Sequence, residues 1–385
     1  SWFGDQTFPH QPLADGEQVA VGNLCLRALW TPGHTPEHLA YLLIDPARGS
    51  DPVALFSGDA LFVGEVGRPD LLGEEQTRTL AEHLYRTVTG RLSRLDDALV
   101  VYPGHTAGSA CGKQIGDAPT TTIGQEKRYS YAFQARSPEA FVRMVLDGMP
   151  KPPTYYPILK RVNRDGPAPL AALPAGQSLT PNDVAARQAD GALVVDTRSP
   201  QAFGTGHVPG AVFAGLGPNF PAWMGWLAPY DRDLILVLDA DERYPEALTD
   251  LRRIGLDRVA GFLASGIDAW REAGLGIEHL PQIPVPALAA HLDDPNDGLT
   301  VLDVRNAEEW SRGHIPGAIH CFAGEIAQGA EPPLKDAGRI AVICGSGYRS
   351  SVAASLLAQR GWSNLANVPG GMNAWTEASL PTTQR

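Results

Sequence analysis

VVDTRSPQAFGTGHVPGAV, at residues 194–212, and VLDVRNAEEWSRGHIPGAI, at residues 301–319, align residue for residue along the chain. Further on, VAGFLASGIDAW at 259–270 aligns in the same way with NLANVPGGMNAW at 364–375. The repeated unit is longer than the roughly 20 to 50 residues of a solenoid repeat, so each copy is expected to fold as a domain. We therefore predict two related domains, at residues 181–281 and 282–385.

Each copy alternates short apolar runs with longer helix-like stretches. The apolar runs lie at 192–195 and 234–238 in the first copy, and at 300–302 and 340–343 in the second. The helix-like stretches lie at 245–254 and 350–360. Strands that alternate with helices are typical of an α/β domain with a parallel sheet.

The chain before the repeats has a different character. Residues 149–180 are rich in proline, which disrupts helices and sheet hydrogen bonds, so we predict an extended linker there. Residues 1–148 form a third unit. It contains three apolar runs, in LCLRALWTPGHT, VALFSGDALF and ALVVYPGHT, each ending in a glycine-containing turn that carries His or Asp.

Composition excludes several classes of protein. The formal net charge of −12 over 385 residues argues against a nucleic-acid-binding protein, which would present a basic surface. No apolar run reaches the ~18 residues of a membrane span, and the opening residues SWFGDQTFPHQ lack the pattern of a secretory signal. The four cysteines have no paired spacing, so we expect a reducing, cytoplasmic environment.

Cys344 lies in VICGSGYRSS, where an apolar run meets a glycine-rich loop and then a helix-like stretch. Loop amides and a helix N-terminus form a concavity that attracts anions. Glycine at 345 and 347 permits the tight turn that such a loop needs. The loop would favour the thiolate, and Arg349 would add to this if it faced inward. The alternative is that Cys344 is only a small apolar residue at the end of a buried strand.

The first copy acts as an internal control, because the position aligned with Cys344 is Asp239. A carboxylate cannot carry transferable sulfur. We therefore expect the first copy to keep the scaffold and to lack the chemistry.

The stretches LDVRNAEEWSRGHIPGAI, CGSGYRS and VPGGMNAW resemble the rhodanese family of sulfurtransferases. The family's loop of a cysteine, four residues and an arginine matches Cys344 and Arg349, which implies catalytic roles for both. The resemblance further implies that a persulfide anion is held by Gly345, Ser346, Gly347, Tyr348 and Ser350. It assigns Asp303, Arg305 and His314 to the scaffold, and we expect Trp375 in the core.

Three loops of the first 148 residues carry potential metal ligands. TPGHTPEH contains His34 and His38, SGDALF contains Asp59, and YPGHTAGS contains His105. Strands of one sheet can bring such loops together, and imidazole with carboxylate suits Zn, Fe or Mn. Two histidines and one carboxylate with open positions are the arrangement of non-haem Fe(II) oxygenases. The alternative is a set of loop side chains that only satisfy local hydrogen bonds.

These loops resemble the metallo-β-lactamase superfamily, which has a four-layer αββα sandwich. His34, Asp59 and His105 match its second histidine, bridging aspartate and last histidine. Its first motif, His-x-His-x-Asp-His, does not occur in this sequence. We therefore expect residues 1–148 to supply only part of that sandwich, giving an α/β multidomain chain overall.

Within that superfamily, GDALFVGEVGRPDLLGEE and TTTIGQEKR are similar to persulfide dioxygenases fused to rhodanese domains. This resemblance implies one Fe(II) per chain, with Zn as an alternative or contaminant, and His34 and Asp59 among the ligands. It places His105 in a vestigial second site and Arg68 near the substrate. His38 would then be a supporting or solvent-exposed residue. We do not expect Cys25 or Cys111 to be catalytic.

Three functions stay open at this stage. The first is a persulfide dioxygenase that yields sulfite, coupled to sulfur transfer through Cys344. The second is a two-metal thioester hydrolase resembling glyoxalase II, and the third is sulfur transfer alone, with an incomplete metal site.

The expected partners are a persulfide of the glutathione, coenzyme A or bacillithiol type, O2, and sulfite or thiosulfate. Neither a nucleic acid nor a membrane is expected. A homo-oligomer and the direction of sulfur flow are left open.

Overall fold

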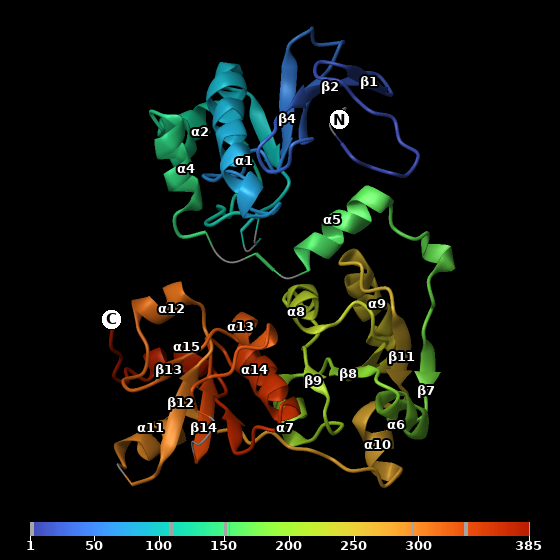
Figure 1. The fold of residues 1–385 in the computed structure, drawn as a ribbon, viewed down its shortest axis with the longest axis vertical. Coiled ribbons are helices and arrows are strands. Elements are labelled where there is room, and N and C mark those ends of the chain that lie inside the picture. Colours follow the sequence, from blue (N-terminus) through green and yellow to red (C-terminus); the bar gives the residue numbers. More distant parts are fainter. Residues whose placement is uncertain are drawn as a thin grey trace. The chain divides into compact units, whose positions relative to one another are not determined.

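The computed structural model describes residues 4–107, 109, 111–149, 152–153, 155–294, 296–334 and 338–384 (Figure 1). The chain divides into two compact units, residues 1–167 and 168–385. The second unit contains both copies of the repeat. No helix in the described part of the chain combines the length and hydrophobicity that a membrane span requires.

The first unit is built on a six-stranded sheet. In spatial order its strands are β1 (Gln18–Val21), β2 (Leu24–Trp30), β3 (Leu39–Ile44), β4 (Pro52–Gly58), β5 (Val100–Pro103) and β6 (Thr121–Thr122). β3 is antiparallel to both β2 and β4, and β4 is parallel to β5. β2, β4 and β5 therefore run in the same direction, and the loops that follow them leave the same edge of the sheet.

Helices and helical turns complete this unit. They are α1 (Glu74–Arg86), η1 (Thr87–Arg91), η2 (Leu92–Arg94), α2 (Ile123–Tyr129), α3 (Tyr131–Gln134), α4 (Pro138–Leu146) and α5 (Tyr156–Asp165). Leu42, Leu55 and Val101 of the sheet share one buried cluster with Leu84 of α1 and Phe141 of α4. Side chains alternate across a strand, and Phe56 and Tyr102, which pair between β4 and β5, are exposed.

Part of the predicted extended linker is helical. α5 occupies residues 156–165, so an extended conformation was the wrong prediction for this stretch. Pro157 lies in the first turn, where a helix tolerates proline because the missing N–H has no partner within the helix. α5 ends at Gly166, whose positive φ of 86° is typical of a helix C-terminus.

The second unit contains two parallel sheets, which confirms the predicted α/β architecture. The first copy has the strand order β7 (Gln177–Leu179), β11 (Val259–Leu263), β10 (Leu234–Val237), β8 (Leu193–Asp196) and β9 (Val212–Phe213). The second copy has the order β13 (Ile319–His320), β12 (Leu299–Asp303), β14 (Arg339–Ile343) and β15 (Leu365–Asn367).

Helices connect these strands (Figure 1). In the first copy they are α6 (Pro181–Ala189), α7 (Pro200–Thr205), α8 (Phe220–Leu227), α9 (Tyr244–Arg253) and α10 (Gly266–Glu272), with short turns η3 (Leu170–Ala172) and η4 (Asp241–Arg243). In the second copy they are α11 (Val285–Asp293), α12 (Ala307–Arg312), α13 (Ala323–Ala327), α14 (Tyr348–Gln359) and α15 (Gly371–Glu377).

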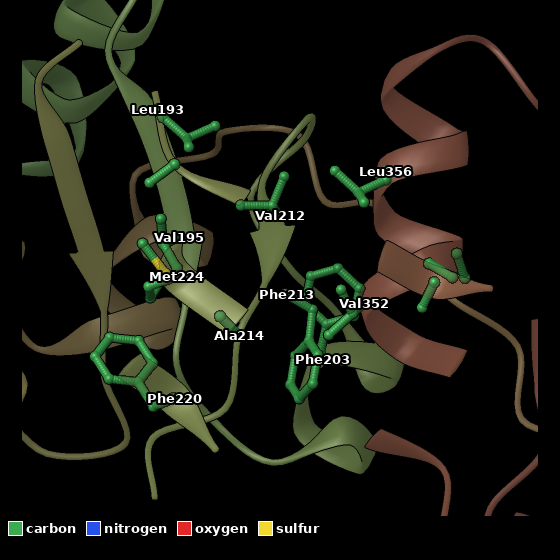
Figure 2. Close-up of a cluster of buried hydrophobic side chains, with 14 of the residues drawn as sticks. Leu193, Val195, Phe203, Val212, Phe213, Ala214, Phe220, Met224, Val352 and Leu356 are labelled. Carbon is green, nitrogen blue, oxygen red and sulfur yellow. The ribbon is translucent and has the colours of Figure 1, made fainter. Parts of the chain in front are cut away.

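One buried cluster joins the two copies. Figure 2 shows Val212 and Phe213 of β9 near Val352 and Leu356 of α14, and all four belong to a single hydrophobic cluster. The backbone N–H of Phe213 donates a hydrogen bond of 3.0 Å to Ser355 Oγ on α14. The helix that follows Cys344 is thus packed against the first copy as well as its own sheet.

The repeated motif forms the same buried ion pair in each copy. Arg198 binds both carboxylate oxygens of Asp196 and the carbonyl oxygen of Gly206. Arg305 binds Asp303 in the same way, and both aspartates have no exposed surface. These pairs tie the end of one strand to the turn after the next helix, which confirms a scaffold role for this part of the motif.

Replacing Arg198 by Ala should lower the free energy of unfolding of the second unit by about 3–5 kcal/mol, because it leaves Asp196 buried and unpaired. The measurement is chemical denaturation followed by circular dichroism. The double variant Asp196→Asn with Arg198→Met should lose less stability than Arg198→Ala, since no buried charge remains. A larger loss in the double variant would contradict this explanation.

Candidate functional site

Cys344 directly follows β14 and has no exposed surface. Its sulfur accepts a hydrogen bond of 3.1 Å from the backbone N–H of Gly347, which has a positive φ of 100°. α14 begins at the next residue, Tyr348. The loop therefore directs at least one amide at the sulfur, as an anion cradle requires.

Two carbonyl groups of the loop are held by α15. The backbone N–H groups of Met372 and Asn373 donate to the carbonyl oxygens of Cys344 and Gly345, at 2.7 and 3.0 Å. Gly371 makes this approach possible, because a Cβ built there would lie 2.2 Å from the Cys344 carbonyl oxygen. Since these carbonyls face α15, the loop turns so that the Gly347 N–H faces the sulfur.

A buried polar chain also reaches Cys344. Ser350 Oγ lies 3.4 Å from the sulfur and 2.5 Å from Asn367 Oδ1. Asn367 Nδ2 donates to Gln282 Oε1 at 2.8 Å. A hydroxyl has one proton to donate. When Ser350 donates it to Asn367, its oxygen can accept the thiol proton of Cys344; a thiolate would require the hydroxyl to turn toward sulfur.

Arg349 is held by a carboxylate. Its two terminal nitrogens each donate to one oxygen of Glu309 at 2.6 Å, from α14 to α12. Burial would raise the pKa of the Glu309 carboxyl, but the hydrogen bonds and charge of Arg349 outweigh it and lower that pKa. A catalytic role for Arg349 stays a prediction, and the sequence reasoning missed its partner.

Tyr348 contacts the first copy. Its hydroxyl donates to the carbonyl oxygen of Gly215 at 2.9 Å, and its ring lies 5.3 Å from that of Phe213. Burial raises the pKa of the Tyr348 hydroxyl, so it stays a neutral donor. The exposed residue of the loop is Ser346. Persulfide binding by Gly345, Ser346, Gly347, Tyr348 and Ser350 stays a prediction.

The first copy lacks these features. Asp239, at the position aligned with Cys344, is exposed, whereas Cys344 is fully buried. Tyr244 and Ala202 occupy the positions aligned with Arg349 and Glu309. Trp375 lies in the buried core of the second copy, as predicted.

In the first unit, the loops after β2, β4 and β5 bring His34, Asp59 and His105 together. His34 Nε2 lies 3.2 Å from Asp59 Oδ2, and His105 Nε2 lies 3.4 Å from Asp59 Oδ1. Each carboxylate oxygen therefore faces one imidazole. Burial lowers the pKa of His34, whereas hydrogen bonds to Asp59 and Cys111 raise the pKa of His105 to about 10.

His38 supports Asp59 and does not belong to the ligand set. Its Nε2 accepts a hydrogen bond of 3.0 Å from the backbone N–H of Asp59, and its Nδ1 bonds to Thr31 Oγ1 at 2.8 Å. Both ring nitrogens are thus engaged by the protein. Burial lowers the pKa of His38 to about 4, which keeps it neutral and able to accept.

Arg68 is fully buried and paired. Its guanidinium binds both oxygens of Asp70 at 2.7 and 2.8 Å. Its carbonyl oxygen accepts a hydrogen bond of 3.0 Å from His34 Nδ1. The carbonyl can only accept, so His34 carries its proton on Nδ1 and keeps Nε2 toward Asp59. A direct substrate contact by Arg68 stays a prediction.

Cys111 lies closer to this cluster than the sequence indicated. Asp59, His105 and Cys111 offer ligand atoms that all lie within 4.8 Å of one another, in the described part of the chain. The Cys111 sulfur is 3.7 Å from the hydroxyl of Tyr156 on α5. Burial, followed by the proximity of Cys111, raises the pKa of Tyr156.

The residues fit a metal ion. Imidazole nitrogen and carboxylate oxygen bind such ions at about 2.0–2.2 Å, which puts neighbouring ligand atoms about 3 Å apart, as His34 Nε2 and Asp59 Oδ2 are. The hydrogen bond from His34 Nδ1 to a carbonyl is the outer contact that metal-bound histidines usually make. The ligand types suit Fe or Zn equally well.

Comparison with known proteins divides the chain in the same way. The rhodanese-like domain model matches residues 180–273 and 285–378. A crystal structure described as a metallo-beta-lactamase from Staphylococcus aureus subsp. aureus COL is similar, with 31% identity and a TM-score of 0.59. The alignment covers 68% of this chain and 73% of that one. The chain thus combines a metallo-β-lactamase fold with two rhodanese-like domains.

Two curated relatives match parts of the chain. A hydroxyacylglutathione hydrolase of Rhodopseudomonas palustris (strain ATCC BAA-98 / CGA009) is 30% identical over 167 residues, which is 39% of this chain and 63% of the relative. YrkF of Bacillus subtilis (strain 168) is 37% identical over 97 residues, which is 25% of this chain. The chain spans about half of the length of the first curated relatives that it matches.

Replacing Gly371 by Ala should reduce sulfur transfer through Cys344 at least tenfold, because the new Cβ would displace the Cys344 carbonyl and with it the loop. The measurement is the rate of thiosulfate-to-cyanide transfer. Gly317→Ala is the matched control: its φ of 79° is also positive, but a Cβ there meets nothing within 4 Å. Equal losses in the two variants would attribute the effect to backbone strain instead.

Proposed function

From a chain that joins a metallo-β-lactamase fold to two rhodanese-like domains, we propose an enzyme of sulfur metabolism. It transfers sulfane sulfur through Cys344 and couples this to metal-dependent oxidation of a low-molecular-weight persulfide. The observation that carries the proposal is the hydrogen bond from the Gly347 amide to the Cys344 sulfur at the end of β14. The first copy has Asp239 at the aligned position and therefore lacks this sulfur.

Sulfur transfer at Cys344 proceeds by two displacements. The Cys344 thiolate attacks the outer sulfur of thiosulfate, the S–S bond breaks, and sulfite leaves with the electron pair. A second thiolate then attacks the outer sulfur of the Cys344 persulfide, which returns Cys344 as thiolate and forms a new persulfide. The Gly347 amide stabilises the negative sulfur in both states. No external oxidant or reductant is needed.

Access to Cys344 requires movement. The side chain has no exposed surface, so neither thiosulfate nor an acceptor thiol reaches the sulfur in the conformation described. The exposed loop residue Ser346 lies between two glycines at 345 and 347, which permit such a change. Loop opening is therefore part of each displacement.

His34 and Asp59 would hold the metal of the first unit, one Fe(II) per chain, with Zn as an alternative. Bound iron would supply O2 activation, so that a persulfide, O2 and water yield a thiol and sulfite. By family resemblance the third ligand would be a histidine of a His-x-His-x-Asp-His motif. This sequence contains no such motif, so His34 and Asp59 are two of the three ligands that the proposal requires, and the metal analysis below tests whether iron is bound. His38 orients Asp59, and the Arg68 carbonyl orients His34.

The two activities share their chemical species. Sulfite formed in the first unit can accept the outer sulfur of the Cys344 persulfide and leave as thiosulfate. In the reverse direction, Cys344 can form a persulfide from thiosulfate and a thiol, which the first unit then oxidises. The acceptor or donor thiol is of the glutathione, coenzyme A or bacillithiol type.

A second candidate is a two-metal thioester hydrolase. Three of the curated relatives are hydroxyacylglutathione hydrolases, at 36%, 33% and 30% identity. Asp59 between His34 and His105, with Cys111 nearby, also suits two metal ions that share one carboxylate. This function requires two metals per chain, and persulfide oxidation requires one iron. The third candidate, sulfur transfer alone, requires no metal.

Elemental analysis of the purified protein, with O2 consumption on glutathione persulfide, separates the three. We expect one iron per chain, O2 uptake and sulfite. Two metals with thioester hydrolysis, or no metal with thiosulfate-to-cyanide transfer retained, would each overturn the dioxygenase proposal. O2 uptake that persists after iron removal would contradict it as well.

Two variants separate the activities. Asp59→Asn should lower metal content and O2 uptake more than about tenfold, since even residues that only support metal ligands change metal affinity by 10–100-fold. It should leave thiosulfate-to-cyanide transfer intact.

The second variant, Cys344→Ser, should abolish thiosulfate-to-cyanide transfer and keep O2 uptake. Loss of both activities in either variant would mean that one site does all the chemistry.

A further inference from the structure

Glu309 is fixed by its own helix. It is the third residue of α12, where its side chain accepts from the backbone N–H of Asn306 at 3.2 Å. In return, the Asn306 side chain accepts from the Glu309 N–H at 2.8 Å. This capping box sets the position of the carboxylate at the start of the helix.

From this position the Glu309 carboxylate accepts hydrogen bonds from both terminal nitrogens of Arg349. The two hydrogen bonds of 2.6 Å are a bidentate contact, the strongest geometry for an arginine and a carboxylate. Only 23% of the Arg349 side chain and 26% of the Glu309 side chain are exposed, so solvent screens the pair weakly. The guanidinium charge at the Cys344 loop is therefore cancelled by a held countercharge.

The pair occurs only where the cysteine occurs. In the first copy the aligned residues are Ala202 and Tyr244, so the acid, the arginine and the cysteine are all absent together. Yet the first copy keeps the helix cap, because Ser199 accepts from the backbone N–H of Ala202. Capping this helix does not need a carboxylate at the third position. A carboxylate at this position is thus present in the copy that has Arg349 and Cys344, and it is not needed to cap the helix.

Sulfur donors differ in the charge that they bring to this loop. Thiosulfate is a dianion with charged oxygens next to the transferable sulfur, whereas a thiol persulfide carries at most one negative charge there. A bare arginine would favour the dianion, and a neutralised arginine would not.

We propose that Glu309 determines donor specificity: by neutralising Arg349 it makes the Cys344 loop favour the persulfide of a small thiol, which has one negative charge at the reacting end, over dianionic oxyanion donors such as thiosulfate. This inference rests on the proposed sulfur transfer at Cys344. It names the donor class of that site and gives the first unit and Cys344 the same substrate.

The test is Glu309→Gln, assayed with thiosulfate and with glutathione persulfide as donors. Glutamine also completes a capping box, so α12 stays capped while Arg349 gains an uncompensated charge. The ratio of kcat/KM for thiosulfate to kcat/KM for the persulfide should rise about tenfold, mainly through a lower KM for thiosulfate. Because the gain is electrostatic, it should shrink as salt concentration rises.

Asn306→Ala is the matched control, since it weakens the same cap and leaves the Glu309–Arg349 pair in place. It should not change the donor ratio. An equal change for both donors in Glu309→Gln, or the same shift in Asn306→Ala, would overturn the proposal. If the unmodified protein transfers sulfur from neither donor, and Cys344→Ser behaves identically, the proposed function itself fails.

Discussion

The Cys344 site depends on the hydrogen bonds that the start of α15 makes to the loop. The backbone N–H groups of Met372 and Asn373 donate hydrogen bonds to the carbonyl oxygens of Cys344 and Gly345. Only a glycine at 371 lets the start of α15 approach the loop so closely. With these carbonyls turned toward α15, the Gly347 amide faces the sulfur. The cradle is therefore a consequence of packing between α15 and the end of β14, and the residues of the loop alone do not produce it.

The first copy contributes to that packing although it lacks the cysteine. α14 carries the loop at its start and is buried along Ser350–Leu357. It meets β9 of the first copy through the shared hydrophobic cluster and through the hydrogen bond from Phe213 to Ser355. Tyr348 adds a hydrogen bond to Gly215 at the loop itself. The first copy, which has Asp239 in place of the cysteine, thus helps to hold the helix that follows Cys344.

The sequence was sufficient to predict the two α/β copies, because the repeat and the alternation of apolar runs with helix-like stretches can be read directly from the residues. It placed His34, Asp59 and His105 together correctly, since β2, β4 and β5 run in one direction. The sequence did not predict which side chains bind Arg349 and Ser350 at the Cys344 site. Glu309 lies 40 residues from Arg349, and Asn367 at the end of β15 bonds to Ser350 on α14, 17 residues away. Whether His38 faces a metal or an amide depends on side-chain orientation, which spacing does not encode.

The sequence analysis missed helix α5 because residues 149–180 are rich in proline, which usually disrupts helices. In α5, however, Pro157 lies in the first turn, where a helix tolerates proline.

Both arginines that the sequence indicated as anion contacts turn out to be held by carboxylates. Arg68 binds Asp70 and Arg349 binds Glu309, each through two hydrogen bonds. An arginine in a bidentate pair attracts a further anion weakly, because its field beyond the pair is that of a dipole. Under the proposed function, neither site would gain selectivity for highly charged substrates from its arginine. At Cys344 the contact that remains is the hydrogen bond from the Gly347 amide to the sulfur, and this is why we propose a persulfide, with its single charge at the terminal sulfur, as the donor.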